Sequence, residues 1–173
     1  MARNLLYPRM YVDSVLDIPL DQLREAQIKA LIFDLDNTVT EWNNREVRQD
    51  VEEWFGKLKA MGFAALILSN NSAARIADVA ARLGVPFIHK ARKPRRQSFY
   101  GAVRLLQVKP EEAAVIGDQI FTDILGGNRA GLFTILVKPL SKREFVGTKV
   151  SRALEFFVLP GLQRRLRREG TRY

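Results

Sequence analysis

The sequence of 173 residues contains no cysteine and a single histidine, His89. The lack of cysteine excludes disulfides, thiolate zinc sites and cysteine nucleophiles. A lone histidine cannot form a histidine metal cluster. No stretch is long and apolar enough to predict a transmembrane helix, and the N-terminus lacks the apolar core of a signal peptide. We therefore expect a cytoplasmic protein.

The composition is typical of a globular protein, with 47% hydrophobic and 27% charged residues. The length fits one domain with enough chain to bury a core. We expect a single domain over residues 1–173. Within it, residues 1–28 form an N-terminal packing segment, residues 29–137 form the core, and residues 138–173 form a basic C-terminal segment.

The net charge of +9 is concentrated near the C-terminus. Residues 138–173 hold 10 Lys and Arg against 3 Asp and Glu, whereas residues 1–137 hold 18 against 16. Such asymmetry is typical of contact with an anionic surface, and it is equally typical of a solvated face. The charge pattern alone leaves both interpretations open.

Short apolar runs alternate with segments of helical periodicity along the core. The runs predict five strands, at residues 30–33, 64–68, 85–88, 113–116 and 133–137. Helices are predicted between them, at about 47–61, 73–83, 95–106 and 123–130. This alternation predicts an α/β, Rossmann-like fold, in which a parallel five-stranded sheet carries helices on both faces as a three-layer structure.

Two carboxylates, Asp34 and Asp36, follow the apolar run at 30–33. In an extended Asp-x-Asp both side chains share one face, where their like charges repel. A cation would relieve that repulsion, and Mg²⁺ suits the site because it prefers oxygen ligands. Asp and Asn are also common turn residues, so a simple turn is the structural alternative.

Polar side chains follow the other strands too, and the carboxyl ends of parallel strands meet at one edge of a sheet. The polar residues at these ends are Asp34, Asp36, Ser69, Asn70, Asp118 and Asp123, and Lys93 begins a helix beside them. The carboxylates can hold a divalent ion, while Ser69, Asn70 and Lys93 can donate to phosphate oxygens. Together these groups supply the nucleophile, the positioning and the charge neutralisation that phosphoryl transfer requires.

Four short motifs stand in order along residues 29–137: Asp34-Leu35-Asp36-Asn37-Thr38, Ser69, Lys93-Pro94 and Gly117-Asp118…Asp123. In order and spacing they resemble the four motifs of the haloacid dehalogenase (HAD) superfamily. The resemblance implies that Asp34 attacks phosphorus to form an aspartyl-phosphate. It also implies that Asp36 protonates the leaving oxygen and then activates water. The dehalogenating members of the superfamily lack an acid at the position of Asp36, because a halide leaving group needs no proton. In having this acid, the chain resembles the phosphatases of the superfamily.

The resemblance further implies that Ser69 and Lys93 bind the phosphoryl group, and we expect Asn70 to help. Mg²⁺ is implied between the carboxylate of Asp34, the backbone carbonyl of Asp36 and Asp118. Asp123 is expected beside the metal or directly behind its ligands, and Thr38 is expected to orient the acidic loop as a hydrogen-bond donor. The short intervals from Thr38 to Gly62 and from Ser69 to Lys93 leave no room for a cap domain.

Residues around the four motifs point to one branch of the superfamily. Leu6-Tyr7-Pro8, Lys90-Ala91-Arg92 and the run from Ile116 to Arg129 look like the YqeG-type branch of subfamily IIIA. That branch is similar to the phosphatase that acts on phosphatidylglycerophosphate, which implies a membrane phospholipid or another large anionic substrate. The basic C-terminal segment fits peripheral contact with the inner membrane surface, and a partner subunit or the substrate itself would cover an open site.

Two other functions remain open from the sequence. A non-catalytic phosphate-sensing or nucleic-acid-binding module could keep the same fold, although such a module has no need of a second acid beside the nucleophile. A receiver domain also forms an aspartyl-phosphate on a parallel sheet. It would carry its phosphoacceptor at the third strand end, where this chain has His89-Lys90.

Overall fold

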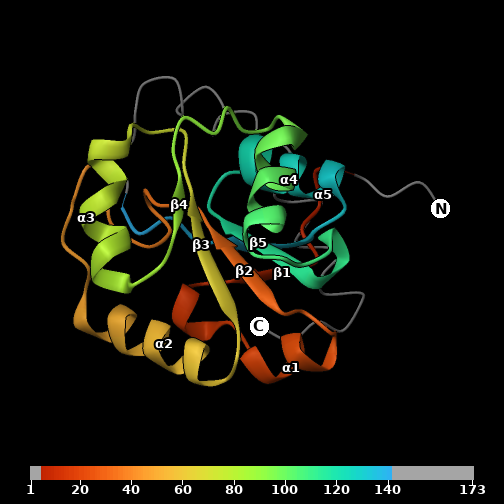
Figure 1. Ribbon diagram of the computed structural model, residues 1–173, viewed down its shortest axis with the longest axis horizontal. Helices are drawn as coiled ribbons and strands as arrows, with labels where there is room; N and C mark the ends of the chain where they lie inside the picture. The colour runs from red at the N-terminus through yellow and green to blue at the C-terminus, as the bar shows by residue number, and fades with distance from the viewer. Residues whose placement is uncertain (1–4, 142–173) are drawn as a thin grey trace.

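A computed structural model describes residues 5–141 of the chain (Figure 1). Its centre is a parallel sheet with the strand order β1-β6-β5-β2-β3-β4. The strands are β1 Met10–Val12, β2 Ala30–Phe33, β3 Ala64–Leu68, β4 Phe87–Ile88, β5 Ala113–Gly117 and β6 Phe133–Val137. The predicted α/β fold with a parallel sheet is therefore confirmed.

The predicted number of five strands is wrong, because the sheet has six. The additional strand, β1, lies in the N-terminal packing segment and pairs in parallel with β6, from Met10 opposite Ile135 to Val12 opposite Val137. It is three residues long and only half-buried. A run this short on a sheet edge carries no clear hydrophobic period, so its pairing depends on the tertiary contact with β6.

The helices cover both faces of the sheet. They are α1 Leu20–Glu25, α2 Gln49–Ala60, α3 Ala73–Leu83, α4 Arg96–Leu105 and α5 Leu125–Ala130. Short 3₁₀ turns stand at Val15–Asp17 and Pro110–Glu112, and a π-helical turn at Ile120–Ile124 leads directly into α5. Figure 1 shows α2 and α3 on one side of the sheet and α4 and α5 on the other.

The strand residues alternate between two hydrophobic cores. Leu31 and Phe33 of β2 pack with α1, α2 and α3, while Ala30 and Ile32 pack with α4 and α5. All four are fully buried. A strand that is covered on both faces appears in the sequence as a continuous apolar run. Such a run predicts the strand, but it does not show which side chains face which helices.

The intervals between the strands leave the carboxyl edge of the sheet open. Residues 38–62 and 69–93 are described throughout, and their helices and strands are α2 in the first interval and α3 with β4 in the second. Neither interval holds a cap domain, as predicted. Among residues 5–141, no helix combines the length and the apolar character needed to cross a bilayer.

Candidate active site

Asp34 leaves β2 at the carboxyl edge of the sheet and is only 6% exposed. Its backbone N–H donates to the carbonyl oxygen of Ile116 in β5 at 2.8 Å, which continues the strand pairing up to the acidic residue. The chain then turns at Asn37, whose φ is 60° and whose N–H donates to Thr40 at 2.7 Å. The Asn37 side chain accepts from the Ser141 hydroxyl at 2.9 Å. These bonds fix the acidic loop where the strand ends.

Lys93 lies between two carboxylates. Its ammonium nitrogen is 2.6 Å from Oδ1 of Asp34 and 2.6 Å from Oδ1 of Asp123. The residue is buried, and its backbone N–H donates to Oδ1 of Asn70 at 2.8 Å. The structure thus brings the predicted phosphate-binding residues Lys93 and Asn70 together, with the Asn70 amide positioning the Lys93 backbone.

Asp34, Asp118 and Asp123 form a buried acidic cluster in which one carboxylate oxygen from each lies within 4.8 Å of the others. Lys93 supplies one positive charge against these three carboxylates. The remaining charge matches a divalent cation, and carboxylate oxygens are the ligands that hard cations prefer. The residues therefore fit a divalent metal. Asp36, expected to use its backbone carbonyl, adds no carboxylate to this cluster.

Burial raises the pKa of Asp34 from 3.8 to about 6. The positive charge of Lys93 opposes this rise, while the negative charge of Asp123 adds to it. Burial alone would lower the pKa of Lys93, but the carboxylates of Asp123 and Asp34 outweigh it and hold the pKa above its ordinary value. Lys93 therefore stays charged at neutral pH.

The approach of Asp123 to the cluster depends on Gly117. A Cβ atom at Gly117 would overlap the carboxyl group of Asp123, so only glycine fits at the end of β5. The carboxylate of Asp123 also accepts the N–H of Gln119 at 3.2 Å. Thr38 is buried, and its hydroxyl donates to Oδ1 of Asp118 at 3.4 Å; its role in orienting the acidic loop stays a prediction.

The carboxylate of Asp36 bonds to residues outside the acidic cluster. Arg75 donates to its Oδ1 at 2.6 Å, and the backbone N–H of Asn43 donates to the same oxygen at 3.1 Å. The side-chain amide of Asn71 donates to Oδ2. Three donors, one from the loop after the acidic residues and two from the start of α3, thus fix the orientation of Asp36 beside Asp34.

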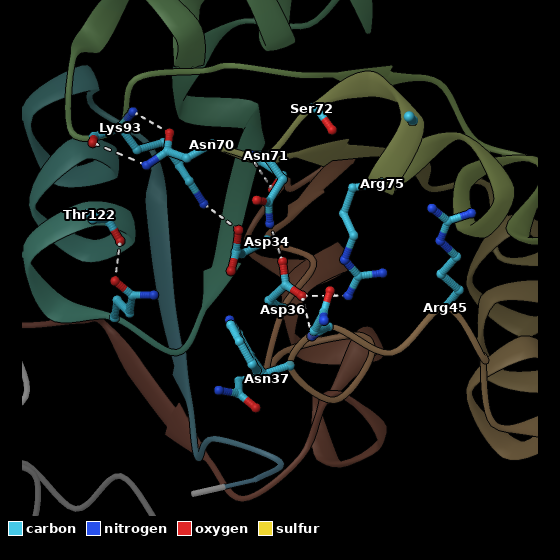
Figure 2. A pocket seen from close by; sticks show the side chains of 15 residues that line it. Asp34, Asp36, Asn37, Arg45, Asn70, Asn71, Ser72, Arg75, Lys93 and Thr122 are labelled. Atoms are coloured by element: carbon cyan, nitrogen blue, oxygen red, sulfur yellow. Dashed lines mark hydrogen bonds and ion pairs between the residues drawn. The ribbon is translucent and has the colours of Figure 1, made fainter. Parts of the chain in front are cut away.

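These residues surround one pocket of about 560 Å³, a size typical of small-molecule sites (Figure 2). The predicted residues that line it are Asp34, Asp36, Ser69, Asn70 and Lys93. Asp118, Asp123 and Thr38 are buried and do not line it. Among the lining residues that the sequence analysis missed are Trp42, Arg45, Asn71, Arg75, Gln119 and Thr122.

The position of Arg75 in the sequence could have identified it as a site residue. It stands in the first turn of α3, where the helix dipole disfavours a positive charge. An arginine at this position therefore calls for a nearby anion, and Asp36 is that anion. The other missed residues lie in loops or in the π-helical turn and carry no comparable signal.

The parallel sheet, the acidic loop after β2 and the buried acidic cluster beside Lys93 agree with a phosphatase of the HAD superfamily. A sequence profile of the family described as "Mitochondrial PGP phosphatase" matches residues 1–140. The chain belongs to this family. It is accordingly a phosphatase that acts on phosphorylated substrates, and its acidic cluster points to a divalent metal.

Relatives with related names agree with this assignment. The "Probable phosphatase YqeG" of Bacillus subtilis (strain 168) is 39% identical over 165 residues, which cover 95% of this chain and 96% of that protein. "Phosphatidylglycerophosphatase GEP4, mitochondrial" of Saccharomyces cerevisiae is 26% identical over 164 residues, 82% of this chain and 86% of that protein. The chain spans 61% of the chloroplastic phosphatidylglycerophosphate phosphatase 1 of Chlamydomonas reinhardtii, at 28% identity over 171 residues and 90% of this chain.

Solved structures share the fold. An uncharacterised protein from Listeria monocytogenes serotype 4b superposes with a TM-score of 0.55 at 21% identity, over 75% of this chain and 98% of that chain. The cobalt-bound deoxy-D-mannose-octulosonate 8-phosphate phosphatase of Haemophilus influenzae gives a TM-score of 0.53 at 17% identity, over 65% and 69% of the two chains.

Proposed function

We propose that the protein is a Mg²⁺-dependent phosphomonoester hydrolase that works through an aspartyl-phosphate on Asp34. The observation that carries the proposal is the position of Asp34. Its carboxylate belongs to the acidic cluster, bonds to Lys93 and lines the pocket at the same time. A nucleophile for phosphoryl transfer needs these neighbours, because the reaction depends on positioning and on neutralisation of charge.

In the first half-reaction a carboxylate oxygen of Asp34 attacks phosphorus, and the bond from phosphorus to the ester oxygen breaks. Ser69 and Asn70 line the pocket as donors to the phosphoryl oxygens. Lys93 spends two of its three N–H donors on Asp34 and Asp123, which leaves one for phosphate. Asp36 transfers its proton to the departing ester oxygen, so an alcohol leaves.

In the second half-reaction the ionised Asp36 takes a proton from water, and the hydroxide formed attacks phosphorus. The bond between phosphorus and Asp34 breaks, which restores the Asp34 carboxylate and releases inorganic phosphate. Asp36 regains its proton in this step and is ready for the next turnover. The hydrogen bonds from Arg75 and Asn71 support both steps because they hold Asp36 beside the reacting atoms.

Mg²⁺ would be held by the carboxylates of Asp34 and Asp118 and the backbone carbonyl of Asp36, with Asp123 completing the acidic surroundings. When bound, it supplies neutralisation of charge on the phosphoryl oxygens. Mg²⁺ suits this site because it is commonly bound by one or two carboxylates together with substrate phosphate.

Phosphatidylglycerophosphate is the substrate that the relatives support best, since the algal and yeast proteins are named for it. A site without a cap domain suits a large substrate that itself excludes water, or a partner subunit in a homo-oligomer that does so. The basic segment at 138–173 supports contact with an anionic membrane surface, although residues 142–173 lie outside the described residues.

Release of inorganic phosphate tests the proposal. The purified protein should hydrolyse p-nitrophenyl phosphate with Mg²⁺, and a chelator should abolish the activity. A panel of phospholipid, sugar, nucleotide and protein phosphates should then show the highest kcat/KM for phosphatidylglycerophosphate. Phosphate binding without any release would instead favour the non-catalytic module.

A further inference from the structure

The pocket extends well beyond the atoms that handle the phosphoryl group. In the view of Figure 2, Lys93 and Asn70 lie on one side of Asp34, while Asp36, Arg75 and Arg45 lie on the other. The phosphoryl chemistry uses the first side and Asp36. It leaves unexplained why two arginines line the far side.

The direction of the leaving group follows from the proposed function. Asp36 must contact the ester oxygen to protonate it, so the leaving group passes Asp36 on its way out of the pocket. The guanidinium of Arg75 is 2.6 Å from Asp36. The next atoms of the leaving group therefore meet Arg75 first and Arg45 beyond it.

Arg75 has donors to spare for a ligand. It gives one N–H to Asp36 and one to the backbone oxygen of Asn44 at 2.8 Å, out of the five that a guanidinium carries. Its side chain is only 11% exposed, so its charge is poorly screened by water. These two bonds also fix the guanidinium plane, which reduces the entropy lost on binding an anion.

Arg45 is held more loosely. Its guanidinium lies 3.0 Å from Asp78 in α3, and both side chains are about 60% exposed. Exposed ion pairs of this kind contribute little to stability, so a ligand anion can compete with Asp78 for the arginine. Trp42 also lines the pocket and is exposed, which offers an apolar surface beside the two charges.

We infer that Arg75 and Arg45 form a second anion subsite, which selects phosphomonoesters whose leaving group carries another negative charge a few atoms from the ester oxygen. A phosphodiester three carbons away has this chemistry. The inference rests on the proposed function and deepens it. It assigns substrate preference to these two arginines, whereas Ser69, Asn70 and Lys93 recognise the phosphoryl group that every substrate shares.

Two water-soluble substrates test the subsite without a membrane. Glycerol 3-phosphate has an uncharged leaving group, and glycerophosphoryl-glycerophosphate has a similar alcohol that also carries a phosphodiester. The wild type should show at least about tenfold higher kcat/KM for the second, the effect of about one charge-assisted hydrogen bond. Arg45→Gln and Arg75→Gln should each lower this ratio about tenfold.

Arg82→Gln is the matched control, because Arg82 also lies in α3 but pairs with Glu52 and does not line the pocket. It should leave both kcat/KM values unchanged. Arg75→Gln should lower both values through Asp36, so the ratio is the decisive quantity. As a second readout, glycerophosphoglycerol should inhibit p-nitrophenyl phosphate hydrolysis by the wild type competitively, with an inhibition constant about tenfold higher for Arg45→Gln.

The outcomes separate the two claims. Hydrolysis of both substrates with equal kcat/KM by the wild type, or a ratio unchanged in Arg45→Gln and Arg75→Gln, overturns the anion subsite and leaves the phosphatase function standing. Failure of the wild type to hydrolyse any phosphomonoester overturns both. A raised ratio that both arginine variants lose and Arg82→Gln keeps supports the subsite.

Discussion

The ammonium of Lys93 lies 2.6 Å from the carboxylate of Asp34 and equally close to that of Asp123. One lysine therefore links the proposed nucleophile to the acidic cluster. All three side chains are nearly inaccessible to water, with exposures of 3%, 9% and 0%. Charges this deeply buried are stable only when they are paired. The stability of the site and its chemistry consequently depend on the same contacts.

Lys93→Met should destabilise the protein strongly in the absence of divalent metal. The substitution leaves three buried carboxylates with no lysine beside them, and loss of one partner of a buried pair costs about 3–5 kcal/mol. Urea denaturation with a chelator present measures the change. Lys29→Met is the control, because Lys29 pairs with Glu112 at an exposed site and should cost no more than about 1 kcal/mol. Equal losses for the two variants would contradict the buried pairing.

Asp34→Asn should abolish turnover and stabilise the metal-free protein in a pH-dependent way. Because the pKa of Asp34 is raised from 3.8 to about 6, the folded state holds its proton more tightly than the unfolded state. The ionised wild-type carboxylate thus lowers stability above the folded pKa and has no effect below the unfolded pKa. The gain from asparagine should be absent near pH 3.8, appear as pH rises, and reach about 2–3 kcal/mol above pH 6.

The comparison needs wild type and variant at the same pH, so that other titrating groups cancel. Asp13→Asn, at a carboxylate that is 79% exposed, should show no such pH-dependent gain. A constant difference between Asp34→Asn and wild type across this range would show that burial does not raise the Asp34 pKa.

Mg²⁺ should raise the midpoint of thermal unfolding, because a ligand that binds only the folded state stabilises it by about 2.7 kcal/mol at one hundred times Kd. Asp118→Asn should remove the effect, since Asp118 is a buried member of the acidic cluster. Asp50→Asn, at a half-exposed residue of α2 outside the cluster, should keep it. A midpoint that does not respond to Mg²⁺ in the wild type would argue against the metal site.

The basic C-terminal segment should bind anionic vesicles at low salt and release them as salt is raised, because screening weakens the attraction. Arginines near an anionic bilayer each contribute about 1 kcal/mol. Replacing Arg164, Arg165, Arg167 and Arg168 with Gln should reduce vesicle flotation and lipid-phosphate turnover while p-nitrophenyl phosphate hydrolysis stays unchanged. Wild-type protein that stays at the bottom of the gradient with phosphatidylglycerol vesicles at the top would end the membrane proposal.

Part of the candidate site could be predicted from the sequence because its residues follow strands that are easy to recognise. Asp34 and Ser69 come directly after largely buried apolar runs, and parallel pairing brings the ends of such strands to one edge. Local rules also located the end of α3 at Gly84, where φ is 61°. These features depend on nearest neighbours in the chain, so the amino-acid pattern contains them.

Contacts between segments that are distant in the sequence could not be predicted. The pairing of β1 with β6 joins residues near opposite ends of the described part of the sequence. The residues of β1 are half-buried and show no distinctive hydrophobic period. Ser72 occupies the N-cap position of α3 without a side-chain cap bond, although serine is a favoured capping residue, and the amide of its neighbour Asn71 contacts Asp36. Both differences arise because tertiary partners outweigh local preferences.

Covalent catalysis by Asp34 is tested most directly by trapping the intermediate in Asp36→Asn. The leaving group of an aryl phosphate departs with little help from an acid. The phosphoryl group of p-nitrophenyl phosphate should therefore still be transferred to Asp34 in this variant. Without the base that activates water, the phosphoenzyme should accumulate. Acid quenching followed by peptide mass spectrometry should find one phosphoryl group on Asp34 and none when Asp34→Asn is added. Release of p-nitrophenol with no phosphoryl group on Asp34, or with the group on another residue, would contradict the mechanism.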